Sequence, residues 1–139
     1  MTRTLRTLAI AATAAIAALA LSACSTDGAD TSGPPVFDGS HVSAASFAAA
    51  VEVEGVTVID VRTPAEFAEG HLPGAVNLNV EDPSFTAMLA QIDPGADYAV
   101  YCRSGNRSRV AIDAMTQAGL TQTVGLEGGI GAWKGDVVQ

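Results

Sequence analysis

The chain has 139 residues and a formal charge of −8 at pH 7, because fifteen aspartates and glutamates outnumber seven lysines and arginines. So acidic a protein is poorly suited to binding nucleic acid or an anionic membrane surface, since both are held through basic patches that neutralise phosphate. Two histidines and two cysteines also leave too few ligands to favour a metal site. We therefore expect no metal, no other cofactor and no nucleic-acid partner.

The first 23 residues are typical of an export signal, with a basic start at Arg3 and Arg6 and then an uncharged run of mostly Ala, Leu and Ile. The sequence LSAC at residues 21–24 resembles the lipobox of bacterial lipoproteins, in which a lipid is attached to the cysteine and the chain is cut just before it. We expect removal of this signal peptide (1–23), lipidation of Cys24 and an extracytoplasmic protein anchored to a bacterial membrane. Plain secretion and a spanning helix, which needs about 20 apolar residues, are the alternatives.

Residues 24–37 are polar and rich in Gly, Pro, Ser and Thr, which predicts a flexible tether. The remaining residues, 38–139, are enough for one domain with a single hydrophobic core. If Cys24 carries a lipid, Cys102 is the only free thiol and an internal disulfide is excluded. An unpaired cysteine in an exported protein is then either a buried, inert residue or a thiol kept for its reactivity.

Apolar, strand-like runs alternate with helix-like segments along this domain. Two of the predicted helices begin with a proline in the tolerated first-turn position, Pro64 and Pro83, and the last ends at Gly119, a usual helix stop. The alternation predicts an α/β fold with a mainly parallel sheet covered by helices on both faces. Helices are predicted at 43–52, 64–69, 83–91 and 108–118, and strands at 56–61, 98–101 and 122–124.

The stretch YCRSGNRSRVA places three arginines beside a cysteine in an otherwise acidic chain. Cys102 directly follows a predicted strand, and residues 103–107 connect it to the next predicted helix. The carboxyl ends of strands and the N-termini of helices present backbone N–H groups that bind anions, and Gly105 allows a short loop to turn its amides inward. The same surroundings lower the pKa of a thiol. Cys102 is therefore a candidate nucleophile in an anion-binding loop.

The alternative is that Cys102 is a small buried hydrophobe, as most free cysteines are. A buried inert site would not be lined with Arg103 and Arg107, so we favour the reactive thiol. His41 and His71 are the only imidazoles, and neither occurs in a recognisable catalytic setting, which argues against a cysteine-histidine protease.

Three blocks of the sequence resemble the rhodanese family of single-domain sulfurtransferases. The first runs over 60–67 and 70–78, the second over the cysteine loop at 101–108, and the third over 126–133, which contains a glycine pair and a tryptophan. They occur in the order expected for that family. The resemblance implies a rhodanese-like three-layer sandwich, with a five-stranded, mainly parallel sheet and helices on both faces.

The resemblance also implies a reaction. Cys102 would take a sulfane sulfur from a small anionic donor such as thiosulfate, hold it as a persulfide and pass it to a thiol or cyanide. The loop amides would stabilise the negative persulfide and the departing anion. Arg103 and Arg107 are the expected donor-orienting charges, whereas Arg109 is left out of the site because it belongs to the helix. The full set of expected substrate-binding residues is Arg103, Ser104, Gly105, Asn106, Arg107 and Ser108.

Four polar residues of the first block, Asp60, Arg62, Glu66 and His71, are expected to form a structural brace beneath the active-site loop rather than an acid-base set. By the same reasoning, the ring of Trp133 is expected to pack the end of the chain against the sheet rather than to touch the substrate.

Two other functions stay open from the sequence. Phosphatases and arsenate reductases of this fold also bind oxyanions around a cysteine, but their loops are longer than the six residues from Cys102 to Arg107, and the shorter loop favours sulfur. The other is a module at the cell surface that carries or senses persulfide without steady turnover. The sequence does not specify the physiological donor, the thiol acceptor or a protein partner.

Overall fold

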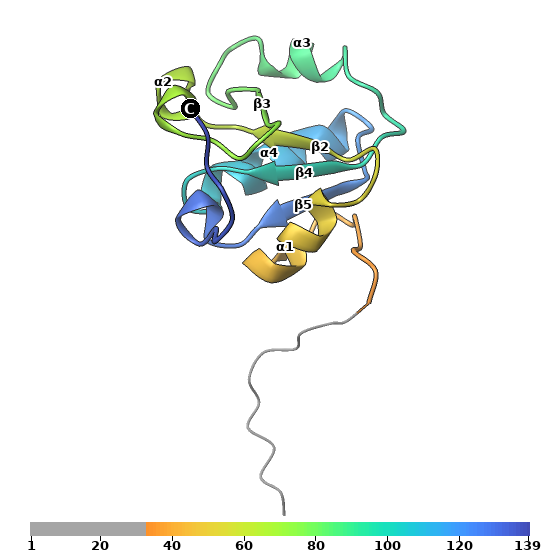
Figure 1. The fold of residues 1–139 in the computed structure, drawn as a ribbon. Helices are drawn as coiled ribbons and strands as arrows, with labels where there is room; N and C mark the ends of the chain where they lie inside the picture. Colours follow the sequence, from red (N-terminus) through yellow and green to blue (C-terminus); the bar gives the residue numbers. More distant parts are fainter. Residues whose placement is uncertain (1–32) are drawn as a thin grey trace, which may run out of the picture.

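The computed structural model describes residues 33–139 (Figure 1). The predicted signal peptide, Cys24 and most of the predicted tether lie outside the described residues. In chain order the elements are β1 (His41–Val42), α1 (Ala44–Val51), β2 (Thr57–Asp60), α2 (Pro64–Glu69), β3 (Val76–Asn77), α3 (Phe85–Leu89), β4 (Tyr98–Tyr101), α4 (Asn106–Gln117), β5 (Thr123–Leu126) and the 3-10 helix η1 (Gly129–Gly131). Within residues 33–139, no helix is both long and apolar enough to cross a membrane.

All five strands pair in parallel, in the order β1-β5-β4-β2-β3. The central strand, β4, is buried along its whole length between β2 and β5. Continuous apolar strands of this kind are expected where helices cover both faces of a sheet. The predicted α/β fold with a five-stranded parallel sheet is confirmed.

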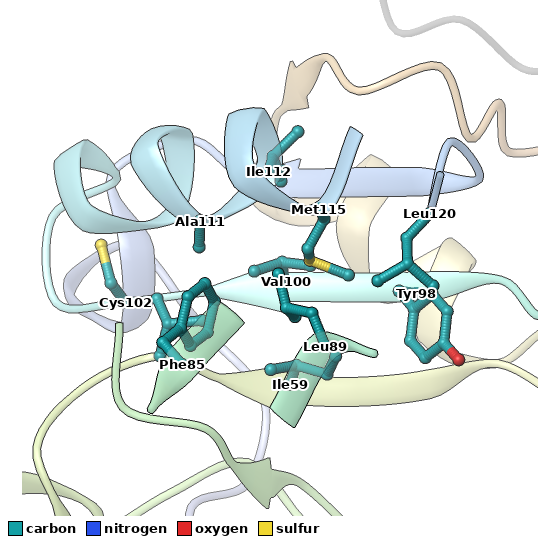
Figure 2. Close-up of a cluster of buried hydrophobic side chains, with 11 residues drawn as sticks. Ile59, Phe85, Leu89, Tyr98, Val100, Cys102, Ala111, Ile112, Met115 and Leu120 are labelled. Atoms are coloured by element: carbon teal, nitrogen blue, oxygen red, sulfur yellow. The ribbon is translucent and has the colours of Figure 1, made fainter. Parts of the chain in front are cut away.

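Two hydrophobic clusters lie on the two faces of the sheet. Side chains of α3 and α4 pack on one face, and Figure 2 shows Cys102 at one end of this cluster, close to Phe85 and Ala111. Phe47 and Ala50 of α1 pack on the other face, where the ring of Trp133 meets that of Phe47 edge-on at 6.1 Å. The loop that follows Cys102 thus begins where the sheet and the α4 face of the core end.

The element boundaries differ from the predictions in two places that have a physical cause. The third helix starts at Phe85, so Pro83 lies before it and the prediction of a first-turn proline is wrong there. The Asp82 carboxylate accepts hydrogen bonds from the N–H and hydroxyl of Ser84, at 2.8 and 2.6 Å, and this turn delays the helix. The helix α4 starts at Asn106 rather than at 108, because Gly105 already caps it in the left-handed conformation.

The carboxyl end of β4 is anchored by Tyr101, the residue before Cys102. Its fully buried hydroxyl accepts the N–H of Leu72 at 3.0 Å, and the Arg62 guanidinium lies over its ring, 5.7 Å from the centroid. A tyrosine buried in this way has both its hydroxyl and its ring in contact with other groups, which fixes its position. The end of β4 therefore holds Cys102 at a defined position.

Candidate active site at the carboxyl end of the central strand

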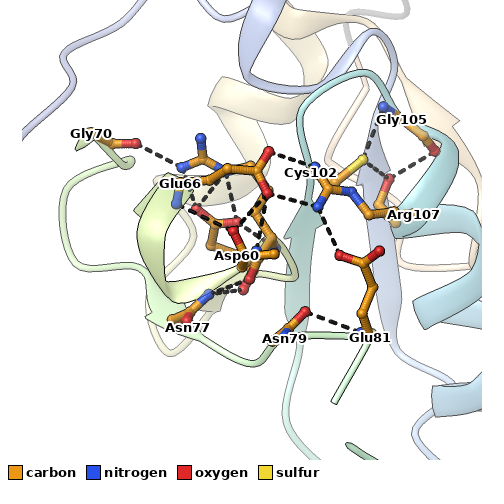
Figure 3. A network of polar contacts seen from close by, with 12 residues as sticks. Asp60, Glu66, Gly70, Asn77, Asn79, Glu81, Cys102, Gly105 and Arg107 are labelled. Atoms are coloured by element: carbon orange, nitrogen blue, oxygen red, sulfur yellow. Dashed lines mark hydrogen bonds and ion pairs between the residues drawn. The ribbon is translucent and has the colours of Figure 1, made fainter. Parts of the chain in front are cut away.

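Cys102 lies just past β4, is only 1% exposed and is a free thiol. Its Sγ accepts the N–H of Gly105 at 3.1 Å, and the hydroxyl of Ser108 lies 3.7 Å away (Figure 3). Burial acts to raise the pKa of the thiol, but hydrogen bonds from the backbone and hydroxyl of Ser108 and from the amides of Ser104 and Gly105 outweigh burial and lower this pKa. The surroundings of the sulfur therefore favour the thiolate.

Gly105 gives the loop its shape, and two features require a glycine there. Its φ of 97° lies in the left-handed region, which costs little for glycine and more for any residue with a side chain. A Cβ atom at this position would also crowd the Arg109 guanidinium and the backbone of Gly128. The turn points the Gly105 N–H at the sulfur while its carbonyl accepts the hydroxyl of Ser108 at 3.0 Å.

The loop rests on the segment that contains η1. The N–H of Ile130 donates to the Cys102 carbonyl at 2.8 Å, and the N–H of Gly131 donates to the Arg103 carbonyl at 3.3 Å. Gly129 has a φ of 59°, and a Cβ on it would overlap the backbone of Cys102 and Arg103. The glycine pair of the third sequence block thus allows two backbones to lie in direct contact behind the cysteine.

Arg107 is held in an ion pair at the rim of the loop. Its guanidinium donates to both oxygens of Glu66, at 2.7 and 2.8 Å, and to Glu81 at 3.3 Å (Figure 3). Glu66 also accepts from the backbone and hydroxyl of Thr63, which makes it part of the capping box of α2. The hydrogen bonds from Arg107, with those from Thr63, lower the pKa of Glu66 to about 2.

The remaining loop residues differ in exposure. Arg103, Ser104 and Asn106 are exposed, and Arg103 makes no ion pair within residues 33–139. Ser108 is fully buried beneath the sulfur. Arg109, which the sequence analysis left out of the site, donates to the Gly105 carbonyl at 3.1 Å and pairs with Glu127. The described loop therefore has one unpaired arginine, Arg103, and it is exposed.

Asp60 and Arg62 form a buried pair below this loop. The Arg62 guanidinium donates to the Asp60 carboxylate at 2.6 to 3.0 Å and to the Gly70 carbonyl at 2.7 Å. The Asn77 amide donates to the carbonyls of both, at 3.0 and 2.8 Å. The pair thereby ties the ends of β2 and β3 to the turn after α2, and the Arg62 guanidinium reaches the ring of Tyr101 beside Cys102.

His71, the fourth residue of the expected brace, lies apart from the loop. Its ring stacks on Phe67 at 3.7 Å between centroids, and Nδ1 is 3.0 Å from the Phe67 carbonyl. Its backbone exchanges two hydrogen bonds with Val138. Of the four residues, Glu66 contacts the loop directly, Asp60 and Arg62 reach it through Tyr101, and His71 fastens the end of the described chain.

The sequence reasoning missed two residues that contact the loop or the start of α4. His41 of β1 lies 2.8 Å from the hydroxyl of Ser108, and Glu81 completes the ion cluster at the rim. No local spacing signals either contact, because His41 precedes Ser108 by 67 residues. Among the residues that the structure describes, no group of three His, Cys, Asp or Glu side chains is placed to hold a metal ion.

Comparisons with known proteins agree with this architecture. A family model described as a rhodanese-like domain matches residues 43–136. A sulfurtransferase from Allochromatium vinosum is 38% identical over 82 residues, which are 59% of this chain and 75% of the relative. A thiosulfate sulfurtransferase, GlpE, from Pseudomonas entomophila is 31% identical over 63% of this chain and 78% of its own length. The crystal structure of a rhodanese-related protein from Thermoplasma volcanium matches with a TM-score of 0.62 and 31% identity, over 70% of this chain and 96% of that one.

The Glu66–Arg107 pair predicts a pH-dependent stability. Because the pKa of Glu66 falls from 4.5 to about 2 on folding, its contribution is complete above about pH 5 and is lost as the pH falls through about 2. Glu66→Gln should lower the free energy of unfolding at pH 7 by about 1 kcal/mol, since both side chains are partly exposed and solvent screens the pair. The deficit should shrink between pH 5 and pH 2, measured by denaturant unfolding.

Glu54→Gln is the matched control, because Glu54 is exposed and makes no ion pair among the described residues. It should change stability little at any pH. A deficit in Glu66→Gln that stays constant down to pH 2 would show that the loss comes from packing rather than from the charge of Glu66.

Proposed function

The chain belongs to the rhodanese-like domain family, and from this membership and the surroundings of Cys102 we propose that it is a sulfurtransferase. It moves a sulfane sulfur from a small anionic donor, such as thiosulfate, to a thiol or cyanide through a persulfide on Cys102. The observation that carries the proposal is the Gly105 N–H, which points at the buried Cys102 sulfur from 3.1 Å at the start of α4. The names of the sulfurtransferase relatives support the same chemistry.

The reaction has two steps. In the first, the Cys102 thiolate attacks the outer sulfur of thiosulfate, the sulfur–sulfur bond of the donor breaks, and sulfite leaves with the electron pair. In the second, a thiolate or cyanide attacks the outer sulfur of the persulfide, and the Cys102 thiolate is restored. Negative charge lies on Sγ of Cys102 in the thiolate and mainly on the outer sulfur in the persulfide, and the amides that face this site stabilise both states. The N-terminus of the 12-residue helix α4 adds a favourable field.

Arg103 is the proposed recruiter of the donor, because its guanidinium is exposed and unpaired within residues 33–139. Arg107 faces Glu66 with both of its terminal nitrogens, so we assign it to the shape of the rim rather than to the donor. Ser104 and Asn106 are exposed beside Arg103 and are placed to contact the donor or the acceptor. Gly105 and Ser108 act on the sulfur itself.

The engagement of Arg107 also bears on the phosphatase alternative. A cysteine-dependent phosphatase needs cationic donors turned toward a tetrahedral phosphate in the loop, and a bidentate arginine is the usual one. Here that arginine is occupied by a carboxylate whose pKa is about 2, so the pair persists at all physiological pH values. This favours transfer of sulfur over hydrolysis of phosphate esters. A persulfide carrier without turnover is distinguished from an enzyme by whether thiocyanate is produced steadily from thiosulfate and cyanide.

The persulfide is tested by intact mass. Treatment with thiosulfate should add the mass of one sulfur atom, cyanide should remove it, and Cys102→Ser should show no gain, because no other thiol lies in the described domain. Steady production of thiocyanate from thiosulfate and cyanide then separates an enzyme from a carrier. The proposal fails if no sulfur is added while a phosphate ester is hydrolysed at a rate that depends on Cys102.

Recruitment by Arg103 is tested by steady-state kinetics. Arg103→Ala should raise the KM for thiosulfate by about threefold to tenfold, as expected for loss of one partly solvated ionic contact worth about 1 kcal/mol, with a small effect on kcat. Lys134→Ala is the control, since Lys134 is also an exposed cation but lies outside the loop. Added salt should reduce the difference in the KM for thiosulfate between the wild type and Arg103→Ala, because salt screens the charge of Arg103. Equal KM values at low salt would remove Arg103 from this role.

We further propose, from the sequence alone, that residues 1–23 are removed, that Cys24 is lipidated, and that 24–37 tether the domain 38–139 to the outer side of a bacterial membrane. Mass spectrometry of the N-terminal peptide from membrane fractions should find a diacylglyceryl group on Cys24, and globomycin should block the cleavage. Cys24→Ala should release the protein from the membrane. Recovery of an unmodified Cys24 peptide would favour plain secretion or a spanning helix.

A further inference from the structure

A chain of hydrogen bonds connects Cys102 to a residue on the edge strand of the sheet. His41 of β1 places Nε2 2.8 Å from Oγ of Ser108. The same oxygen lies 3.7 Å from Sγ of Cys102 and 3.0 Å from the Gly105 carbonyl oxygen. Three separate parts of the fold, β1, α4 and the cysteine loop, therefore meet at one buried hydroxyl group.

The neighbouring strand leaves room for the imidazole. Gly125 of β5 is the register partner of His41. A Cβ atom on Gly125 would overlap Cε1, Nε2 and Nδ1 of the His41 ring. Gly125 is not among the glycines with positive φ, so its backbone does not require glycine. The missing side chain is what allows the ring to lie across β5 and reach Ser108. Position 125 thus serves the contact between His41 and Ser108.

A count of hydrogens assigns the direction of each bond. The Ser108 hydroxyl has one hydrogen, and it donates to the Gly105 carbonyl. The Cys102 thiol donates to Ser108 Oγ. The close contact between Ser108 and His41 then needs a hydrogen on Nε2, so His41 is the donor and Ser108 Oγ accepts from both neighbours.

The network changes when Cys102 loses its proton. The thiolate is an acceptor only, and the Ser108 hydrogen can turn from the Gly105 carbonyl to the sulfur. That carbonyl is not left without a partner, because Arg109 donates to it through its guanidinium at 3.1 Å and its backbone N–H at 3.3 Å. His41 continues to donate to Oγ, which polarises the hydroxyl. Because Nε2 is a donor, the Ser108 hydroxyl does not donate its hydrogen to the imidazole.

We propose that His41 is a positioning residue for Cys102, which acts through Ser108. By donating from Nε2 to the serine oxygen, it directs the hydroxyl hydrogen to the sulfur whenever that sulfur is anionic. This positioning role toward the Cys102 thiolate is independent of the reaction that Cys102 performs. The same role toward a persulfide on Cys102 rests on the proposed sulfurtransferase function.

The surroundings of His41 connect this network to solvent. The ring lines an open pocket of about 370 Å³ together with Arg109 and Asp113 of α4 and Glu127, which follows β5. Burial, followed by the charge of Arg109, lowers the pKa of His41, and Glu127 and Asp113 act in the opposite direction without cancelling this shift. The lowered pKa favours the neutral imidazole, which donates to Ser108 as the Nε2–H tautomer. At lower pH it becomes a cationic and stronger donor, which favours the thiolate further.

The test is the pH profile of alkylation of Cys102 by iodoacetamide, a reaction of the thiolate that needs no sulfur donor. His41→Ala should slow alkylation at pH 6 by about threefold or more, because loss of the donor to Ser108 raises the pKa of the thiol. His41→Gln should retain most of the wild-type rate, because the glutamine amide can donate to Ser108 in place of Nε2. Equal rates in wild type and His41→Ala would overturn the proposal.

The route through Ser108 is tested by a double-mutant cycle. Ser108→Ala should slow alkylation, and adding His41→Ala to it should have no further effect, because the link is already broken. If His41→Ala slows alkylation equally in both backgrounds, its effect does not pass through Ser108 and the assignment fails. Since alkylation does not depend on sulfur transfer, a protein that forms no persulfide but behaves as expected here separates the two proposals.

A second measurement covers the case in which the variants unfold. Coupling between two titrating groups is reciprocal, so the Cys102 thiolate should raise the pKa of His41. An NMR titration of the His41 ring in the wild type should show a step in the ring chemical shifts that follows the ionisation of Cys102, and this step should be absent in Cys102→Ala. Its absence in the wild type would show that the two groups are not coupled.

Discussion

The hydrogen bond from the Gly105 amide to the Cys102 sulfur is the interaction on which the rest of the site depends. It exists only because Gly105 takes the left-handed conformation, and that turn is held from both sides. Arg109 and Ser108 bind the Gly105 carbonyl, while the backbone around Gly129 supports the loop from behind. Many of the surrounding contacts therefore serve the placement of one N–H group rather than direct contact with a substrate.

The three arginines that follow the cysteine have different roles in the folded protein. Arg107 is neutralised by Glu66, Arg109 by Glu127, and Arg103 alone is unpaired within the described domain. The local excess of positive charge is therefore smaller in the structure than in the sequence. Backbone amides and the start of α4 supply most of the stabilisation of the anionic sulfur. This arrangement suits an acidic protein, since it needs few free cations to hold an anion.

Ser108 links this loop to the rest of the sheet. It is fully buried, lies in the first turn of α4, and is the point at which the sulfur, the Gly105 carbonyl and His41 meet. Cys102 itself is almost inaccessible, whereas His41 lines an open pocket together with residues of α4. The hydroxyl thus connects the ionisation of a buried thiol with a residue in contact with solvent.

Local patterns in the sequence were enough to predict the alternation of helices and strands, the parallel sheet, and the position of Cys102 between a strand and a helix. These features depend on the hydrophobic period and on capping residues that lie close together in the chain. The two-residue strands β1 and β3 are too short to show a period, and the start of α3 depended on the turn made by Asp82 and Ser84. The roles of the individual site residues stay predictions.

Only the tertiary structure decided which arginine is unpaired and that His41 reaches the site, because Glu66 and Arg107 are 41 residues apart and His41 and Ser108 are 67 apart. Contacts over such separations are set by strand order and register, which no local pattern encodes.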